Sequence, residues 1–441
     1  MSSEAKDIFD LGNGLIMRRS SPEDADALAE FNAKIHGESD VDRTRLANWT
    51  RDLLTCPHPT FNADDFIIIE VSSTGQIVSS SCLLPQTWSY EGIEFGVGRP
   101  ELIGTLPEYR GKGLVRAQFD ELHKWCVERN MPVQVITGIP YFYRQFGYEM
   151  ALNLNGGRTG FESSVQKLKE GETELFRIRP AKESDISFID DVYKYSSVRH
   201  AINAVRDEAL WNYEITGRSE ESIPAGWWEI IERVERDEPV GFLMRPKHSE
   251  NHAILYELKQ NVSWMDVTPS VIRYLWKITK ELTAQDNKSQ PSFTFLLGEE
   301  HPVHQMMGND LPLVRKPYAY FVRVPDLIGF IYHITPALEQ RLASSIAVRH
   351  SGELKLNFYI SGLNLKFEKG NLTSIDDWKP STDAWGDAAF PDLTFLQMLF
   401  GYRSYAELRQ SYADCWCGNE SNRALLDILF PKKPSAVLGI A

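Results

Sequence analysis

The stretch that decides the fold is Leu102–Tyr148, LIGTLPEYRGKGLVRAQFDELHKWCVERNMPVQVITGIPYFYRQFGY. The apolar run in front of Pro107 predicts a short strand. Apolar side chains then recur at spacings of four, three and four residues within 115–126, which predicts an amphipathic helix. Asn130-Met131-Pro132 ends this helix, and the apolar residues that follow predict a second buried strand. The stretch therefore predicts a strand, a loop, a helix and a strand.

The loop between the first strand and the helix is Tyr109-Arg-Gly-Lys-Gly113. Such a loop presents backbone N–H groups at the positive end of a helix dipole, which favours an anion and above all a pyrophosphate. The NTPase phosphate loop needs a Ser or Thr hydroxyl where this chain has Leu114. The dinucleotide fingerprint needs three glycines, whereas this loop has only Gly111 and Gly113.

Arg110-Gly-Lys-Gly-Leu114 instead resembles the Arg/Gln-x-x-Gly-x-Gly/Ala loop of GNAT N-acetyltransferases, which holds the pyrophosphate of acetyl-CoA. Downstream, Phe142–Tyr148 resembles the Phe-Tyr-x-x-x-Gly-Phe/Tyr segment of the same family. The two segments occur in the family's order around a strand, a helix and a strand. The alternative is an ordinary turn that carries surface charges.

Length and composition set the wider frame. A chain of 441 residues predicts about three domains. The net charge of −14 makes a nucleic-acid partner unexpected; it would attract a cationic amine, although a solvated acidic surface is the simpler explanation. We expect no membrane span and no signal peptide. The cysteine count of five is odd, and Cys415-Trp-Cys417 lacks the spacing of a redox or zinc pair, so we expect reduced thiols and a cytoplasmic location.

The N-terminal part predicts one complete unit. Leu15–Arg19 predicts a strand, and a helix is expected to start near Ser21. Two apolar runs, Phe66–Val71 and Ile77–Leu84, predict a hairpin. With the stretch described above, these elements follow the GNAT order, so residues 1–155 resemble a catalytic GNAT N-acetyltransferase domain.

The opening pattern then repeats. Phe176–Asp185 matches Leu15–Asp24 at a distance of 161 residues, which predicts a second GNAT-like unit at 156–325. Residues 254–272 of this copy lack paired glycines, so we expect it to be degenerate and to bind no acetyl-CoA.

The last part of the chain has a different pattern. A helical region is expected at 326–342, and the alternation within Leu354–Phe367 predicts a hairpin with one apolar face. Helices are expected within 393–429. A strand layer under helices at 326–441 resembles a sterol-carrier-protein-like domain. The fold class we expect is α+β, with two tandem GNAT-like units of mixed sheets flanked by helices and this third domain.

Two GNAT units followed by such a domain resemble the Eis (enhanced intracellular survival) family of N-acetyltransferases. The resemblance implies acetyl-CoA as the co-substrate, no metal, and a homo-oligomer, for which a hexamer is our first expectation. It also implies a small-molecule or lysine primary amine as the acceptor, since family members accept aminoglycosides, polyamines and lysine side chains.

The resemblance also implies which residues form the site. Backbone groups of Ile103, Gly104 and Thr105 would bind the acetyl group and pantetheine arm. Gly138 and Ile139 would line the cofactor. Backbone N–H groups of Gly111, Lys112, Gly113, Leu114, Val115 and Arg116 would hold the pyrophosphate. The side chains of Arg110 and Lys112 would add positive charge. A solvated turn is the alternative for Arg110 and Lys112.

Tyr143 matches the family's general acid, which protonates the coenzyme A thiolate. Tyr141 and Tyr148 are its rivals, and packing in the core is the alternative for all three. The base implied by the family is the free C-terminal carboxylate, here that of Ala441, and the apolar tail 436–441 fits either a buried carboxylate or surface packing.

Three further residues carry open alternatives. His301 and His304 have the spacing of a metal pair, but Pro302 and the surroundings favour a structural role. Trp49 lies where the family lines its acceptor pocket, and a core position is equally compatible. The competing function is a non-catalytic lipid- or acyl-CoA-binding protein that uses the C-terminal domain.

Overall fold

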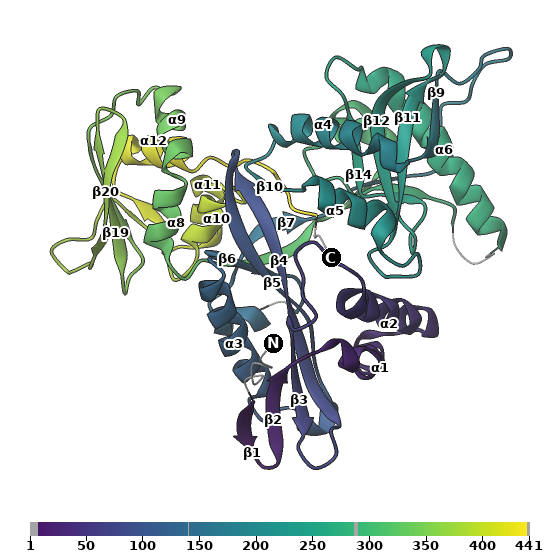
Figure 1. The fold of residues 1–441 in the computed structure, drawn as a ribbon. Helices are drawn as coiled ribbons and strands as arrows, with labels where there is room; N and C mark the ends of the chain where they lie inside the picture. Colours follow the sequence, from purple (N-terminus) through teal and green to yellow (C-terminus); the bar gives the residue numbers. More distant parts are fainter. Residues whose placement is uncertain (1–7, 140, 286–289, 439–441) are drawn as a thin grey trace.

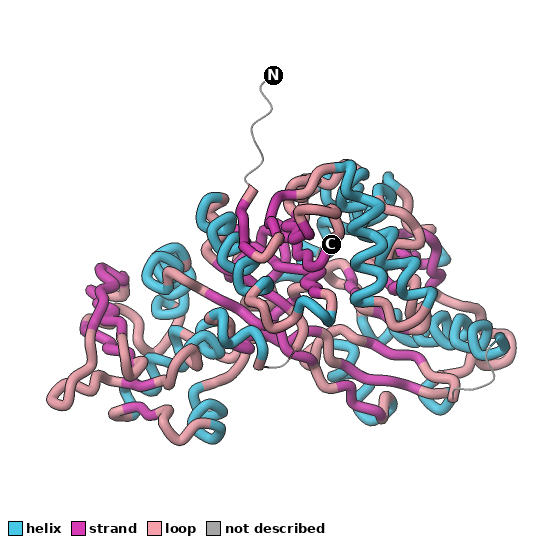
Figure 2. Tube along the Cα trace, turned by 90° about the horizontal axis from the view of Figure 1, so that it is seen from below, coloured by secondary structure: helices cyan, strands magenta, loops and turns pink. Residues whose placement is uncertain are grey.

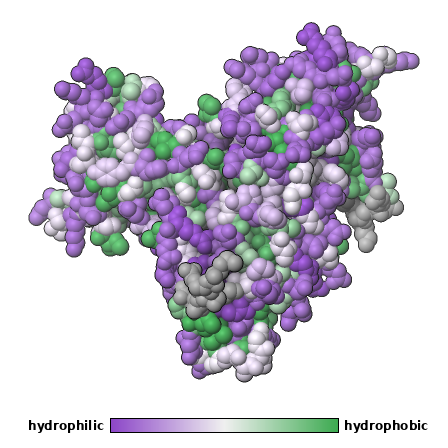
Figure 3. All heavy atoms as spheres, viewed as in Figure 1, coloured by the Kyte–Doolittle hydropathy of each residue, from purple (hydrophilic) through white to green (hydrophobic). Residues whose placement is uncertain are grey.

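The computed structural model describes residues 8–139, 141–285 and 290–438 of the chain. Figure 1 shows a lobe from the N-terminal part at the bottom, a second lobe at the upper right and a C-terminal lobe at the upper left. All of them contain both strands and helices (Figure 2), so the expected mixed α+β fold is confirmed. The face in Figure 3 is mainly hydrophilic.

The first lobe follows the expected order of strands and helices. Its main elements are β1 (Phe9–Gly12), β2 (Leu15–Arg19), α1 (Ala25–His36), α2 (Asp40–Thr55), β3 (Phe66–Val71), β4 (Ile77–Tyr90), β5 (Ile93–Thr105), α3 (Leu114–Glu128), β6 (Val133–Ile136), the 3-10 helix η3 (Phe142–Phe146) and β7 (Glu149–Leu154). Strands β1 to β5 are antiparallel neighbours, and β6 is parallel to β5. The strand expected from Leu102 is the end of the much longer β5.

The second lobe contains two four-stranded sheets, β14-β12-β11-β9 and β13-β15-β8-β16. Its elements, with the strand β17 that leaves it, are β8 (Gly157–Gly160), β9 (Phe176–Pro180), α4 (Ile186–Ser197), β10 (Ile202–Ala204), α5 (Glu208–Asn212), β11 (Gly226–Arg233), β12 (Glu238–Pro246), β13 (His252–Ala253), β14 (Leu255–Leu258), α6 (Trp264–Gln285), β15 (Phe293–Phe295), α7 (Pro302–Met307), β16 (Leu313–Arg315) and β17 (Tyr318–Arg323).

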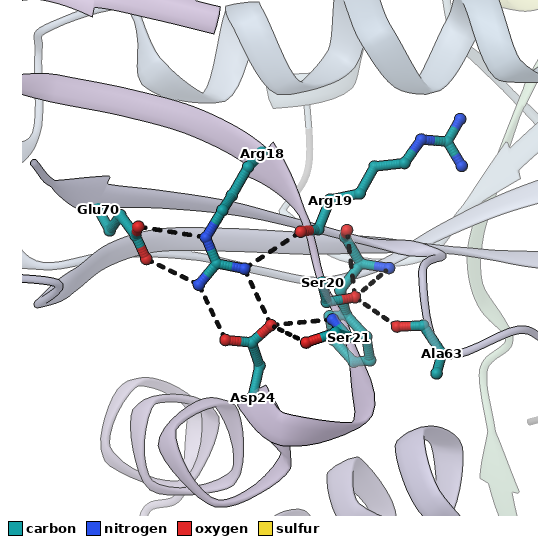
Figure 4. A network of polar contacts seen from close by, with 8 residues as sticks. Arg18, Arg19, Ser20, Ser21, Asp24, Ala63 and Glu70 are labelled. Carbon is teal, nitrogen blue, oxygen red and sulfur yellow. Dashed lines mark hydrogen bonds and ion pairs between the residues drawn. The ribbon is translucent and has the colours of Figure 1, made fainter. Parts of the chain in front are cut away.

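A polar network marks the internal repeat in three dimensions. Arg18 on β2 donates to Glu70 on β3 at 3.1 Å and to Asp24 at 2.9 Å (Figure 4). The second lobe builds the same network, because Arg179 on β9 donates at 2.7 Å both to Glu232 on β11 and to Asp185. In each copy an arginine ties the first strand to its neighbour and to the helix start. The periodicity seen in the sequence is therefore structural.

The first sheet takes two strands from the 156–325 segment, β10 beside β4 and β17 at the far side of β6. β17 lies between β6 and β7 and is antiparallel to both. In the second lobe, β8 lies in the matching place between β15 and β16. The division into 1–155, 156–325 and 326–441 stays a prediction, and the first sheet is complete only with β17.

The third lobe has a five-stranded sheet, β20-β19-β18-β21-β22, and helices. Its elements are α8 (Leu327–His333), α9 (Thr335–Ala343), β18 (Gly352–Asn357), β19 (Gly362–Glu368), β20 (Asn371–Trp378), β21 (Ala388–Ala389), α10 (Phe395–Leu399), α11 (Tyr405–Ser411), β22 (Trp416–Cys417), α12 (Glu420–Leu429) and β23 (Ser435–Ala436). The expected hairpin is β18–β19, with Leu354, Leu356 and Leu365 fully buried. The sterol-carrier likeness of this lobe stays a prediction.

Candidate active site

The glycine loop has the backbone conformation that an anion cradle requires. Gly111 and Gly113 have φ of +75° and +78°, in the left-handed region that glycine adopts without strain. Gly113 is the N-cap of α3, a helix of 15 residues. The first N–H groups of a helix have no partner within it, so those of α3 are available at its positive end.

The charged side chains of the loop lie around this helix end. Arg110 Nε donates to the carbonyl of Thr105 at 3.3 Å, and Lys112 Nζ lies 4.4 Å from the centre of the Tyr109 ring. Arg116 Nη2 donates to Gln145 Oε1 at 3.1 Å, which joins α3 to η3. Arg110 and Lys112 are exposed, so a phosphate can reach them and a solvated turn remains compatible.

A cavity of about 610 Å³ opens beside the loop. Eleven of the expected site residues line it, namely Ile103, Gly104, Thr105, Arg110, Gly111, Gly113, Leu114, Val115, Arg116, Ile139 and Tyr143. Lys112 and Gly138 do not line it, although a Cβ at Gly138 would lie 2.8 Å from the Tyr143 hydroxyl. Ala441 lies outside the described residues. The structure thus gathers most of the expected cofactor residues around one cavity.

The strand β5 separates from its neighbour at the cavity. Its pairing with β6 covers Val97 and Gly98 only, so the backbone farther along β5 has no strand partner on that side in the part of the chain that is described. A bulge also interrupts its pairing with β4, where Leu102 has φ of +50°. Bulges re-aim side chains next to binding sites. The free edge at Ile103–Thr105 can therefore hydrogen-bond an extended ligand.

Of the three tyrosines, only Tyr143 lines the cavity. Tyr148 is fully buried and its hydroxyl is 2.9 Å from His123 Nε2, while the Tyr141 side chain is 78% exposed. Burial, and then the negative charge of Glu101, raise the pKa of Tyr143 to about 12. Its hydroxyl is therefore protonated at neutral pH and is a hydrogen-bond donor.

Several residues at the cavity were not expected from the sequence. His36, at the end of α1, lines it, and Glu101 acts electrostatically on both His36 and Tyr143. From β17, Tyr318 hydrogen-bonds the carbonyl of Gly138, and the ring of Phe321 lies 5.8 Å from that of Tyr143. No local motif marks these residues, because helix packing and the inserted strand bring them to the site.

The other candidates, Trp49, His301 and His304, do not line the cavity. Trp49 is 7% exposed and packs in the core between the first two helices and the sheet. His301 caps α7 by accepting from the N–H of Val303, and its Nε2 is 3.0 Å from the carbonyl of Tyr256. Among the described residues, no group of three or more His, Cys, Asp or Glu side chains could hold a metal ion.

The second lobe lacks the glycine cradle at the corresponding place. Between β14 and α6 the chain runs Lys259–Ser263, with no glycine. The ring of Trp264, the first residue of α6, lies 5.0 Å from those of Tyr256 and His301. Aromatic side chains thus pack together at the start of α6, in the place of the glycine loop of the first lobe.

The C-terminal tail leaves the third lobe and joins the other two. β23 pairs in parallel with β10, and β10 pairs with β4 of the first sheet. Val437 is 3% exposed, and the carbonyl of Leu438 accepts from the buried Arg206 at 3.4 Å. The last described residues are therefore packed and hydrogen-bonded.

Comparison with known proteins identifies the first lobe. Residues 17–151 match the family model described as "Acetyltransferase (GNAT) domain". No curated protein matches the chain.

Solved structures resemble almost the whole chain. A GCN5-related N-acetyltransferase from Kribbella flavida matches with a TM-score of 0.62 and 16% identity, over 96% of this chain and 99% of that one. One from Anabaena variabilis matches with a TM-score of 0.63 and 13% identity, over 96% and 99%. Eis1 from Mycobacterium abscessus matches with a TM-score of 0.59 and 10% identity, over 96% and 100%. At these identities the likeness concerns the fold. The match of residues 17–151 to the GNAT acetyltransferase domain agrees with the expectation that the chain is an acetyltransferase enzyme.

Proposed function

We propose that the protein transfers an acetyl group from acetyl-CoA to a primary amine by direct attack. The observation that carries this proposal is that the glycine cradle of Gly111 and Gly113, the free edge of β5 and the Tyr143 hydroxyl all border one cavity of about 610 Å³. The cradle would bind pyrophosphate, and the edge at Ile103–Thr105 would bind the pantetheine arm. Absence of a Cβ clash at either glycine leaves room for phosphate oxygens.

Tyr143 would protonate the leaving thiolate. An ordinary thiol has a pKa of about 8.5, so the thiolate is a good leaving group and needs modest help. A phenol whose pKa is raised to about 12 serves as a hydrogen-bond donor that completes proton transfer as the C–S bond breaks. Burial against Phe119, Phe142 and Phe321 would hold the ring in place.

The base in this proposal is the C-terminal carboxylate of Ala441. The ordered tail up to Leu438 supports it, because the chain is already packed between the first two lobes three residues before its end. A carboxylate with an ordinary pKa of about 3 to 4 is poorly matched to an ammonium ion. It would therefore act through a water molecule or by holding the cation.

The acceptor in this proposal is a small polyamine-like or aminoglycoside-like amine, or a lysine side chain. The family resemblance and the net charge of −14 support a cationic acceptor. The alternative, a non-catalytic lipid- or acyl-CoA-binding protein, is disfavoured by the position of Tyr143 in the cavity.

Further parts of the proposal concern the rest of the chain. The second lobe would bind no acetyl-CoA, and the protein would be a cytoplasmic homo-oligomer, with a hexamer as the first expectation. All five cysteines are free, which suits a reducing compartment. No helix in the described ranges is long and apolar enough to cross a membrane. Light scattering should show an oligomer at micromolar concentration, and a stable monomer would contradict this part.

The function is tested by supplying acetyl-CoA and a panel of amines and by measuring free thiol release. We expect acetylated product with at least one small polyamine, aminoglycoside or lysine peptide. Acetyl-CoA binding without acetylation of any amine would favour the non-catalytic alternative.

A further inference from the structure

His36, at the end of α1, lines the cavity beside the free edge of β5. The closeness depends on Gly104, where a Cβ would lie 2.8 Å from Ile35 and 3.2 Å from His36 Nε2. Gly37, the C-cap of α1, has no room for a Cβ either, because it would meet Arg43 and the carbonyl of Ala33. The absence of a side chain at Gly104 lets the end of α1 lie directly on the strand, which brings an imidazole to the segment where the thioester would be bound.

One nitrogen of His36 is left without a partner. Nε2 is buried and has no hydrogen-bond partner within the described residues. In the neutral tautomer that carries its proton on Nδ1, Nε2 has a lone pair that no described group uses.

Glu101 faces the same histidine because of the bulge in β5. In the pairing with β4, Glu101 is opposite Cys82 and Gly104 is opposite Ser80. Three residues along β5 therefore correspond to two residues along β4. This offset brings Glu101 and Gly104 to the same face of the sheet, which is the face that α1 covers. The Glu101 carboxylate is 17% exposed and accepts from Arg99 at 2.5 Å.

We propose that His36 Nε2 accepts the proton that the acceptor ammonium ion loses, and that Glu101 positions the histidine and stabilises its charged form. This inference rests on the proposed acetyl transfer and adds a proton acceptor to it. The C-terminal carboxylate then holds the cation, a role that its low ordinary pKa permits.

The proton balance closes with these groups. The ammonium ion gives one proton to His36 and becomes a neutral amine. Its lone pair forms the N–C bond to the thioester carbonyl, and the C–S bond breaks. As the C–S bond breaks, Tyr143 donates its proton to the thiolate. The nitrogen loses a second proton when the amide forms, and this proton reaches Tyr143 through solvent and restores its hydroxyl. His36 returns its proton to solvent, so one proton is released for each amide and thiol formed.

The charged surroundings of His36 determine its pH dependence. Burial lowers the pKa of His36 below its ordinary value of 6.5, and Glu101 acts against this effect. Glu101 on β5 is itself paired with Arg99, and Tyr143 on η3 borders the same cavity as a neutral hydroxyl. Below its pKa the histidine is protonated and cannot accept another proton. Turnover should therefore decrease as the pH is lowered, in an acidic limb that lies below pH 6.5.

The test measures kcat against pH at saturating amine and acetyl-CoA for wild type and three variants. For His36→Gln we expect kcat to fall about 100-fold and the acidic limb to disappear, with the Kd for acetyl-CoA unchanged. For Glu101→Gln, which keeps the side-chain shape, we expect the limb to move to lower pH. His350→Gln is the matched control, because His350 also has a buried Nε2 without a partner in the described residues but lies in the third lobe.

Each outcome decides between defined possibilities. Wild-type kcat and an intact acidic limb in His36→Gln would overturn the inference, as would an equal loss of kcat in His350→Gln. If His36→Gln does not bind acetyl-CoA, the limb in Glu101→Gln decides: a shift to lower pH supports the inference and an unchanged limb overturns it. Failure of wild type to acetylate any amine would instead refute the proposed function.

Discussion

Replacement of Gly113 by alanine tests the cradle without adding a clash. The φ of Gly113 is +78°, and a Cβ built there meets no atom within 4 Å. The same holds for Gly111 at +75°. Alanine at either position therefore costs only the strain of a left-handed backbone, which is about 1 kcal/mol for a residue with a Cβ.

In the alanine variants the unliganded loop can relax out of the left-handed conformation, and acetyl-CoA binding must restore it, so the strain appears as lost affinity. About 1 kcal/mol corresponds to a Kd increase of about 5-fold for Gly113→Ala, and the double variant with Gly111→Ala should reach about 30-fold. Titration calorimetry with acetyl-CoA measures both values. Gly75→Ala is the matched control, because Gly75 has φ of +71° and open space but lies in the turn between β3 and β4.

The control should bear the same strain and keep the wild-type Kd. A wild-type Kd for the double variant would refute the cradle at Gly111 and Gly113. Equal weakening by Gly75→Ala would show that general destabilisation, and not the loop conformation, reduces the affinity.

The remaining predictions concern the acid, the chain end and the second lobe. Tyr143→Phe should lower kcat about 100-fold with an unchanged Kd for acetyl-CoA, and a fully active Phe variant would assign the acid elsewhere. Because the pKa of Tyr143 is raised to about 12, ionisation of this group should not lower wild-type kcat up to about pH 10. A few residues added after Ala441, or deletion of 439–441, should abolish most transfer in rate assays while calorimetry shows normal acetyl-CoA binding; a fully active tagged protein would exclude the carboxylate. Calorimetry should give one acetyl-CoA site per chain, and that site should be lost in Gly113→Glu; a second site would contradict a degenerate second lobe.

Local sequence was sufficient to predict the loop and the place of Tyr143 beside it, but not the groups around them. The glycines of the loop lie within a few residues of each other, and their spacing alone specifies positive φ and a helix start. Tyr143 lies in Phe142–Tyr148, a segment whose residue pattern can also be recognised without reference to distant parts of the chain. These features do not depend on distant parts of the chain.

The rest of the site depends on packing between distant segments. β17 enters the first sheet from a segment more than 160 residues after β7, and strand pairing at that distance leaves no local pattern. The bulge at Leu102 has no glycine to mark it, so the approach of Glu101 to His36 could not be predicted. The sequence shows that the tail is apolar, but the pairing of the tail with β10 depends on the arrangement of all three lobes.

A crystal structure of the protein with acetyl-CoA tests the central claim most directly. We predict the pyrophosphate within hydrogen-bond distance of the N–H groups of Gly111–Arg116, and the thioester sulfur within about 3.5 Å of the Tyr143 hydroxyl. Acetyl-CoA bound in the second or third lobe, or bound in the first lobe with its sulfur remote from Tyr143, would contradict the account.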